Sequence, residues 1–181
     1  MAADLHLHTT YSDGSLTPAQ LVRTMKEAGF SIMAVTDHDI VDGVAEAVAE
    51  GEKLGVEVIA GVEFSTEWHK NEIHMLGYFV DYRAAWFIDW LKERQAGRKR
   101  RIQNIIDKLT GHGLTITAEE VLAISGCGSA GRPHVAQALV ASGQVNTLKE
   151  AFDKYLRHGA PAYVPHFRLT PQEAIAIIHK A

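Results

Sequence analysis

The stretch ADLHLHTTYSDGSLTPAQLV, residues 3–22, decides the fold. Its first part alternates apolar leucines with His6 and His8, which is the period of a β-strand with one apolar and one polar face. Thr17 and Pro18 then predict a helix, as its N-cap and its first residue. The chain therefore opens as a strand followed by a helix, with ligand-type side chains on the strand.

The same strand and helix unit recurs farther along the chain. SIMAVT, residues 31–36, is a short apolar strand, and a helix is expected from an N-cap at Asp42 to Gly55. VEVIAGVEF, residues 56–64, predicts a third strand and IHMLGYFV, residues 73–80, a fourth. Since helices join the first three strands, these strands should pair in parallel. The pattern predicts an α/β barrel or an open α/β sheet.

From residue 84 onward the pattern becomes helical. Helices are expected near residues 86–109, 117–124, 132–143 and 147–159. PAYVP, residues 161–165, returns to extended chain, and a helix capped by Thr170 begins at Pro171. We therefore predict that residues 1–83 and 161–181 form part of a barrel and that residues 84–160 form a helical insertion domain. Four or five strands do not close a barrel, so we expect the N-terminal part of a longer protein; a complete small open sheet is the alternative.

Composition excludes several classes of protein. A hydrophobic content of 46% supports a real core, and a net charge of −4 argues against a strongly basic nucleic-acid binder. The single cysteine, Cys127, has no disulfide partner within the chain. No apolar run approaches the roughly 20 residues that span a bilayer. The expected location is the cytoplasm, with no membrane partner.

Candidate ligands cluster where the predicted strands end, which is where α/β folds place their sites. His74 is the exception, because it stands at the start of the fourth strand and fits only if that strand is antiparallel or its boundary is misplaced. His134 lies in the insertion, in the motif GRPH. Histidines outside this pattern are taken as ordinary surface or core residues: His69, His112, His158 and His179. The positions at successive strand ends favour His6, His8, His38 and Glu63 as metal ligands, and the further candidates are Asp13, His74 and His134.

A set of imidazole and carboxylate ligands without thiolate favours Mn²⁺, Fe²⁺ or Zn²⁺. The number of ligands exceeds what one ion needs, so two or three ions with Glu63 as the bridging carboxylate are expected. Such a cluster can hold a bridging hydroxide and the oxygens of a phosphoryl group, which indicates phosphoester hydrolysis. Asp4, Asp37 and Asp39 are expected to orient the ligands. Asp13 next to Gly14 also has the simpler interpretation of a turn.

Taken together, the motifs DLHLHT, SDG, TDHD, GVEFS, IHMLGY and GRPHVA resemble those of the PHP-domain phosphoesterases, and in particular the branch of bacterial nucleotide phosphatases and 5'-to-3' exoribonucleases. The resemblance implies a distorted (βα)7 barrel with a Mn, Fe or Zn cluster held by the seven residues above. It also implies that Arg132 contacts the substrate phosphate, for which a guanidinium is well suited. The late Asp-x-His pair of this family is absent from the chain, which leaves the expected cluster incomplete.

The expected function is hydrolysis of a phosphate ester of a nucleotide, such as a 5'-nucleotide or a 3',5'-bisphosphate, or of the 5' end of a short RNA. The general acid is not identified. Histidinol phosphate or another small monoester is an alternative substrate, and a non-catalytic module that binds metal or phosphate is an alternative function. The run RKRR, residues 98–101, is interpreted as a solvated helix face, with steering of an anionic substrate as the second possibility. Trp86 and Trp90 are interpreted as core residues.

Overall fold

The structure is a computed structural model that describes residues 2–69, 71–125, 130–165 and 169–181. The chain divides into two compact units. The first unit comprises Met1–Arg94 and Arg168–Ala181, and the second comprises Gln95–Phe167. The predicted domain boundaries at residues 84 and 160 stay a prediction.

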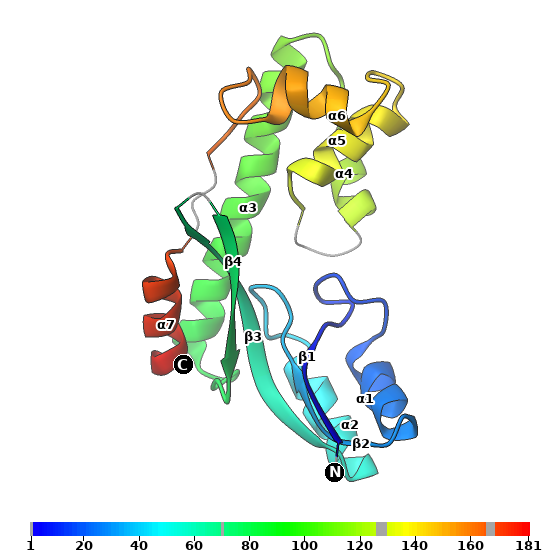
Figure 1. Cartoon of the computed structure of the whole chain (residues 1–181), viewed down its shortest axis with the longest axis vertical. Coiled ribbons are helices and arrows are strands. Elements are labelled where there is room, and N and C mark those ends of the chain that lie inside the picture. The colour runs from blue at the N-terminus through cyan, green and yellow to red at the C-terminus, as the bar shows by residue number, and fades with distance from the viewer. Residues whose placement is uncertain (1, 70, 126–129, 166–168) are drawn as a thin grey trace. The chain divides into compact units, whose positions relative to one another are not determined.

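The first unit is a mixed α/β fold (Figure 1). Its strands are β1 (Ala2–Leu7), β2 (Phe30–Val35), β3 (Glu57–Trp68) and β4 (Asn71–Tyr78). Its helices are α1 (Pro18–Glu27), α2 (Val44–Leu54), the first part of α3 (Ala85–Gly111) and α7 (Pro171–Lys180). These elements fall where the sequence predicted strands and helices.

The sheet has the strand order β1-β2-β3-β4. The first three strands are parallel, which confirms the prediction from their helical connections, whereas β4 pairs antiparallel with β3. The sheet is curled, since the hydroxyl of Tyr78 on β4 donates to the carbonyl oxygen of Leu5 on β1 over 2.9 Å, although β1 and β4 are not neighbours in the sheet. The described strands show this curled sheet, and not a closed seven-stranded barrel.

Helices α1 and α2 pack against β2 and β3, and α7 packs against β3 and β4. The core between them contains Phe64 and Phe87, both fully buried, whose rings meet edge to face at 6.4 Å. Trp86 and Trp90 pack against this core, as predicted. Thr17 is the N-cap of α1, as predicted, and it also forms a capping box with Gln20. The predicted N-cap at Asp42 is wrong, because α2 begins one residue later than that cap requires, with Gly43 at the N-cap position.

The second unit is helical in its described residues. Besides the rest of α3 it contains α4 (Ala118–Ser125), α5 (Arg132–Ala141), α6 (Leu148–Ala151) and a π-helical turn, η1 (Phe152–Leu156). Its own core includes Ile105, Leu109, Leu139 and Leu156. The expected extended segment at residues 161–165 is irregular and contains no strand. In the part of the chain that the structure describes, no helix has the length and apolarity needed to cross a membrane.

Candidate metal centre

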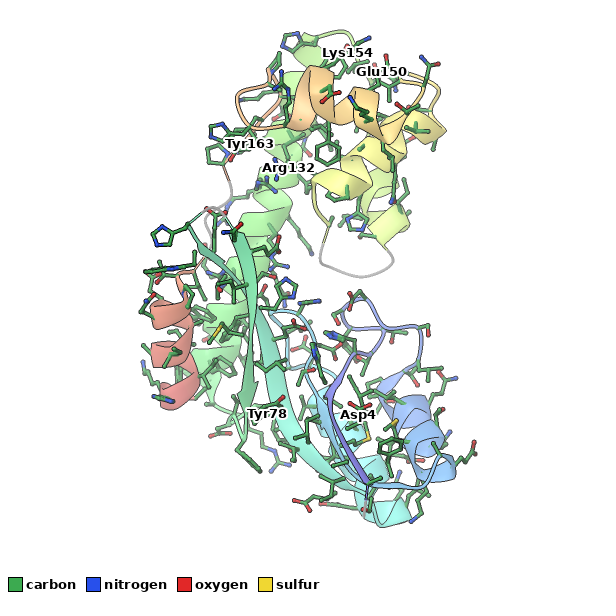
Figure 2. All side chains as sticks on the ribbon, in the orientation of Figure 1. Asp4, Tyr78, Arg132, Glu150, Lys154 and Tyr163 are labelled. Carbon is green, nitrogen blue, oxygen red and sulfur yellow. The ribbon has the colours of Figure 1, made fainter. Side chains whose placement is uncertain are left out.

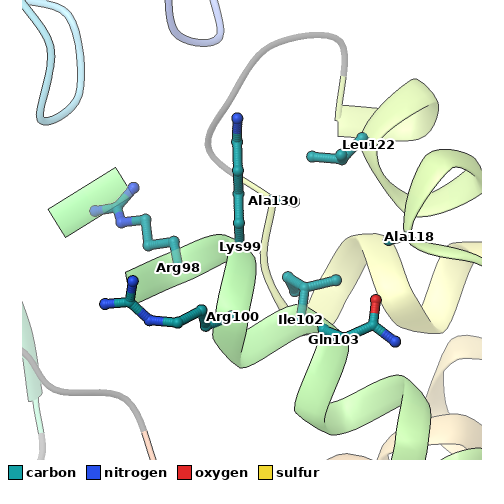
Figure 3. A pocket seen from close by; sticks show the side chains of 8 residues that line it. All are labelled: Arg98, Lys99, Arg100, Ile102, Gln103, Ala118, Leu122 and Ala130. Atoms are coloured by element: carbon teal, nitrogen blue, oxygen red, sulfur yellow. The ribbon is translucent and has the colours of Figure 1, made fainter. Parts of the chain in front are cut away.

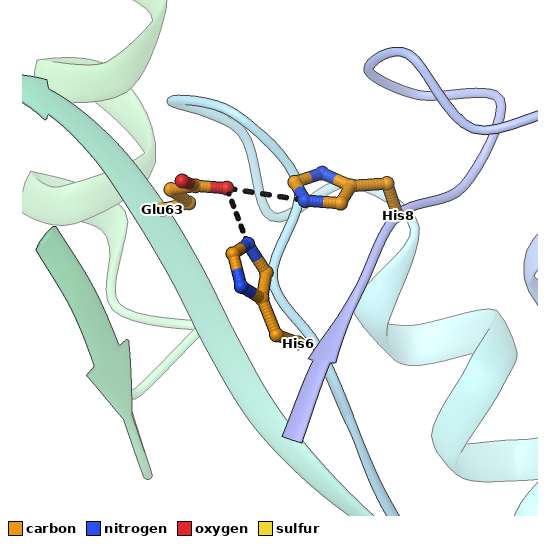
Figure 4. Close-up of side chains that lie close together, drawn as sticks. All are labelled: His6, His8 and Glu63. Carbon is orange, nitrogen blue, oxygen red and sulfur yellow. Dashed lines mark hydrogen bonds and ion pairs between the residues drawn. The ribbon is translucent and has the colours of Figure 1, made fainter. Parts of the chain in front are cut away.

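The carboxylate of Glu63 lies at the centre of a group of four histidines, and only 2% of its side chain is exposed. Its Oε2 atom lies 2.9 Å from Nε2 of His6 and 3.1 Å from Nε2 of His8. The same oxygen lies 3.6 Å from Nδ1 of His38. Its Oε1 atom lies 2.7 Å from Nδ1 of His74. Figure 4 shows how the rings of His6 and His8 converge on this carboxylate from β1 and the residue that follows it.

Asp13 provides a second carboxylate on the far side of two of these rings. Its Oδ1 atom lies 3.2 Å from Nδ1 of His8, and its Oδ2 atom lies 3.6 Å from Nε2 of His38. His8 and His38 therefore each turn one ring nitrogen toward Glu63 and the other toward Asp13. The two carboxylates lie at opposite edges of both rings.

Three overlapping groups of side chains have ligand atoms within 4.8 Å of one another. They are His6, His8 and Glu63; His8, Asp13 and His38; and His38, Glu63 and His74. Buried Nδ1 of His38 has no hydrogen-bond partner among the described residues, which is unusual for a buried polar atom and fits a nitrogen that can serve as a metal ligand. The group has the donor types that Mn²⁺, Fe²⁺ and Zn²⁺ accept in proteins.

The pairing of strands explains why these side chains meet. His38 forms an isolated parallel bridge with Glu63, so the alignment of β2 and β3 continues past the end of β2. The backbone N–H of Glu63 donates to the carbonyl of Asp37, and the N–H of Asp39 donates to the carbonyl of Glu63. Because β4 is antiparallel, its first half lies beside the last half of β3, where His74 pairs with Ser65. This orientation resolves the apparent misplacement of His74 at the start of a strand.

A buried hydrogen-bond network holds the loop that carries Asp13. The carboxylate of Asp37 accepts from both the backbone N–H and the hydroxyl of Thr9, each at 2.7 Å. It also accepts from the hydroxyl of Ser12 at 2.5 Å. The Ser12 oxygen lies 3.2 Å from Nδ1 of His8 and 3.3 Å from a carboxylate oxygen of Asp13. Thr9 and Ser12 were missed from the sequence, because hydroxyl residues beside an Asp-Gly turn have no pattern that separates them from turn chemistry.

Gly14 fits this loop because it has no side chain. A Cβ atom at this position would lie 2.2 Å from the carbonyl oxygen of His8 and 2.4 Å from its carbonyl carbon. The backbone N–H of Gly14 donates to the carbonyl of Thr9. The loop after β1 therefore lies directly against the backbone of a candidate ligand.

The other aspartates predicted to orient ligands have different surroundings. Asp4 accepts from the backbone N–H of His6 at 3.2 Å, so its contact is with the main chain of that residue. Asp39 is fully buried, adopts a positive φ of 52°, and its Oδ1 lies 3.8 Å from Nε of Arg94 on α3. A positive φ in a residue other than glycine marks a constrained backbone next to His38.

Electrostatic effects in the cluster follow from burial and from the crowding of ionisable groups. Burial lowers the pKa of His38, although the nearby carboxylates of Glu63 and Asp13 oppose this effect. Burial raises the pKa of Glu63, but the hydrogen bond from His6 and the neighbouring imidazoles outweigh it, so this pKa lies below its ordinary value. The cluster thus favours a carboxylate anion among the rings.

Arg132 and His134 belong to the second unit, at the start of α5. Nδ1 of His134 accepts a hydrogen bond from the N–H of Gly131 at 3.0 Å, which places the proton of a neutral ring on Nε2. Binding of a metal by His134 requires a change in this arrangement. Arg132 donates to the carbonyl of Leu156 at 3.2 Å, and its guanidinium lies over the ring of Tyr163 at 5.5 Å (Figure 2). Neither residue is part of the groups in the first unit.

A mixed α/β fold that gathers histidine and carboxylate ligands at its strand ends is typical of metal-dependent hydrolases. The profile of the PHP domain matches residues 4–164 of the chain. The chain belongs to the PHP domain family.

Two curated relatives cover nearly the whole chain. The 5'-3' exoribonuclease Rnm of Escherichia coli is 35% identical over 178 residues, which are 97% of this chain and 61% of the relative. The 3',5'-nucleoside bisphosphate phosphatase of Chromobacterium violaceum is 32% identical over 178 residues, which are 97% of this chain and 62% of the relative. The chain thus spans about three fifths of the length of these relatives.

Two solved structures share the fold. One is an amidohydrolase from Chromobacterium violaceum with bound sulfate and no metal, at a TM-score of 0.75 and 31% identity, over 99% of this chain and 63% of that one. The other is assigned as a metal-dependent phosphoesterase from Bifidobacterium adolescentis, at a TM-score of 0.74 and 31% identity, with the same coverage of 99% and 63%. These similarities confirm the predicted family.

Proposed function

We propose that this protein is a metal-dependent phosphoesterase that hydrolyses a phosphate ester of a nucleotide or of the 5' end of a short RNA. The arrangement of four histidine rings around the buried carboxylate of Glu63 carries this proposal. Of these five side chains only Glu63 is fully buried, and a buried carboxylate is costly unless a cation or a proton compensates its charge. The family and the names of the two curated relatives support the same reaction class.

The donor set fits a cluster of two or three Mn²⁺, Fe²⁺ or Zn²⁺ ions. Glu63 presents both carboxylate oxygens to different rings, as a bridging ligand would. His8 and His38 offer nitrogens toward both carboxylates, so the overlapping groups can serve neighbouring ions. The proposed ligands are His6, His8, Asp13, His38, Glu63 and His74, with His134 as a further candidate once its hydrogen bond to Gly131 is broken.

When bound, divalent ions supply Lewis acidity and a lowered pKa of coordinated water. The protein itself contributes the fixed positions of the donors. Asp37, through Thr9 and Ser12, holds the loop of Asp13 in place, and the bridge between His38 and Glu63 keeps two donors on adjacent strands. The buried position of Glu63 keeps bulk water from one side of the site. A rigid, preorganised donor set is what this chemistry requires.

A nucleotide or a short RNA end is the proposed substrate, and the cytoplasm is the proposed location. The names of the relatives that cover the chain support both classes of substrate, a 5'-3' exoribonuclease and a nucleoside bisphosphate phosphatase. Arg132 is proposed to contact a phosphate through N–H groups of its guanidinium other than the one that donates to the carbonyl of Leu156.

Replacement of Glu63 tests the proposal. Glu63→Gln keeps the shape of the side chain but removes its negative charge and replaces one ligand oxygen with an amide NH2 group, which cannot bind a cation. We expect bound Mn²⁺ and the rate of phosphate release each to fall by more than about 100-fold, since even residues behind the ligands account for about 10–100-fold. Glu57→Gln, at the exposed start of β3, is the matched control and should retain both the bound Mn²⁺ and the rate of phosphate release. We measure metal content by elemental analysis. We measure activity as the hydrolysis of a nucleoside 3',5'-bisphosphate and of a 5'-phosphorylated RNA.

Adding histidinol phosphate to these two substrates separates the alternatives. Turnover of histidinol phosphate without turnover of either nucleotide substrate would replace the proposed substrate class with a small monoester. Stoichiometric metal with no turnover of any ester would leave a metal-binding module. A rate that survives both a chelator and Glu63→Gln would rule out the cluster as the site of the reaction.

A further inference from the structure

A cavity of about 330 Å³ lies within the second unit, apart from the groups that form the candidate metal centre. Ile102 on α3 with Ala118 and Leu122 on α4 form its apolar wall. Three successive cations of α3 also line the cavity: Arg98, Lys99 and Arg100. The volume falls in the range of small-ligand sites, about 300–1,000 Å³.

The cavity has two chemically distinct sides. Figure 3 shows the guanidinium groups of Arg98 and Arg100 on one side of Lys99, and the side chains of Ile102 and Leu122 on the other. Ile102 is buried, with 2% exposure, whereas Lys99 and Arg100 are exposed. An apolar wall beside a cationic edge suits a ligand that has a flat, weakly polar part and an anionic part.

The charge of the surrounding unit favours an anion. Residues 95–167 contain nine Lys and Arg against five Asp and Glu, a formal charge of +4. The rest of the chain contains nine Lys and Arg against seventeen Asp and Glu, a formal charge of −8. The acidic balance of the whole chain therefore conceals a basic helical unit, which is the usual electrostatic footprint of a nucleic-acid contact.

We propose that this cavity is a nucleotide subsite for single-stranded RNA. One base of the strand packs against Ile102, Ala118 and Leu122, and the guanidinium planes of the arginines can stack on it or meet the backbone phosphates. A strand provides one negative charge per nucleotide, which matches a run of successive cations better than a single phosphate does. The inference rests on the proposed function and narrows its substrate class to a chain of nucleotides.

Two variants test the two sides of the cavity. Lys99→Glu reverses a charge at the cationic edge, and Ala118→Trp fills the apolar side. Their matched controls are Lys92→Glu, an exposed lysine of α3 in the first unit, and Ala123→Trp, an exposed alanine of α4 that does not line the cavity. Binding of a fluorescent oligoribonucleotide is measured by anisotropy in the presence of a chelator, so that no turnover is involved.

We expect each cavity variant to weaken RNA binding about tenfold relative to its control, which corresponds to about 1.4 kcal/mol. Lys99→Glu should also reduce the slope of log K against log salt by about 0.7, the value for one phosphate contact on a single strand. Equal binding by variants and controls would overturn the subsite. Competition with AMP is a second check. If AMP displaces the labelled RNA at the same concentration as unlabelled RNA does, the cavity is a site for free nucleotides and the RNA subsite is wrong.

The assay separates this inference from the proposed function. If the unmodified protein with Mn²⁺ releases phosphate from nucleotides while the cavity variants bind RNA normally, the subsite is wrong and the function stands. If the cavity variants lose RNA binding but the protein hydrolyses no ester, the function is wrong and the cavity is an RNA site without the reaction.

Discussion

The two units of the chain differ in architecture and in charge. The first is a curled sheet with helices and a formal charge of −8, and it contains all members of the three overlapping ligand groups. The second is helical in its described residues and has a formal charge of +4. A cluster of cations needs an acidic surrounding, whereas polyanions need a basic one. The difference fits the two proposals, which place most of the metal ligands in the first unit and an RNA subsite in the second.

Among the substitutions that distinguish the two units, that of Gly14 should have the largest effect, and it should destabilise the first unit and not the second. In Gly14→Ala the new methyl group would overlap the carbonyl of His8, and backbone atoms cannot move aside cheaply. We expect a loss of about 1–3 kcal/mol in the free energy of unfolding, typical of overpacking. Metal binding should weaken as well, because the loop of Asp13 must shift.

The matched control lies in the second unit. Gly111, the last residue of α3, has no heavy atom within 4 Å of an added Cβ, so Gly111→Ala should leave the stability of the first unit unchanged. All three tryptophans, Trp68, Trp86 and Trp90, lie in the first unit, so tryptophan fluorescence during urea unfolding reports on that unit. Equal stability of Gly14→Ala and the unmodified protein would show that the loop is not fixed against β1.

The first unit was predictable from sequence to a large extent, because its signals are local. Alternating leucines and histidines define β1, Thr17 and Thr170 cap helices through reciprocal capping boxes, and Gly55 ends α2 in a left-handed conformation. The prediction of Asp42 as the N-cap was wrong by one residue, because a capping-type side chain near a helix start does not fix which residue begins the helix, and here Gly43 is the N-cap. The small number of predicted strands indicated that the barrel would not close, but the curl of the sheet could not be predicted, because it depends on the tilt and stagger of all strands together.

The candidate donors and the supporting Asp37 could be predicted from the sequence, whereas the hydroxyl groups that bind Asp37 could not. Histidine and glutamate at strand ends are visible in the sequence because such residues are out of place on a packed strand. The antiparallel direction of β4, which brings His74 to Glu63, depends on the short connection after Trp68 and was left open. The contact of Ser12 with Asp37 joins residues 25 positions apart, and no periodicity marks such a pair.

Removal of the Ser12 hydroxyl should have an intermediate effect confined to the first unit. Ser12→Ala deletes the hydrogen bond to Asp37 and the contacts with His8 and Asp13, but leaves every proposed ligand in place. We expect the affinity for Mn²⁺ to fall by about 10–100-fold, the range for residues that orient ligands. Ser15→Ala, a neighbouring serine outside this network, is the control. Titration with Mn²⁺ measures the effect, and an unchanged affinity would mean that the loop is held by Thr9 and Gly14 alone.

Neutralisation of Glu150 should have the smallest effect and should be confined to the second unit. Glu150 contacts Lys154 at 2.8 Å and the backbone N–H of Asn146 at 2.8 Å (Figure 2). The hydrogen bond from Lys154 and that from Asn146 lower the pKa of Glu150 from 4.5 to about 2. Because this pKa is lower in the folded state, its stabilising contribution is complete above pH 4.5 and is lost as the pH falls toward 2.

Glu150→Gln should therefore make the stability of the second unit less dependent on pH across that window. Amide hydrogen exchange of α6 and the π-helical turn, measured as the pH falls from 4.5 toward 2, reads the second unit, while tryptophan fluorescence reads the first. Glu119→Gln, an exposed acidic residue in the first turn of α4, is the control for removal of one negative charge. If the stability of the second unit depends on pH in the same way in Glu150→Gln and in the unmodified protein, the contacts of Glu150 do not contribute to that dependence. A change that also appeared in tryptophan fluorescence would show that the two units unfold together, and the contrast between them would then be one of charge and chemistry but not of stability.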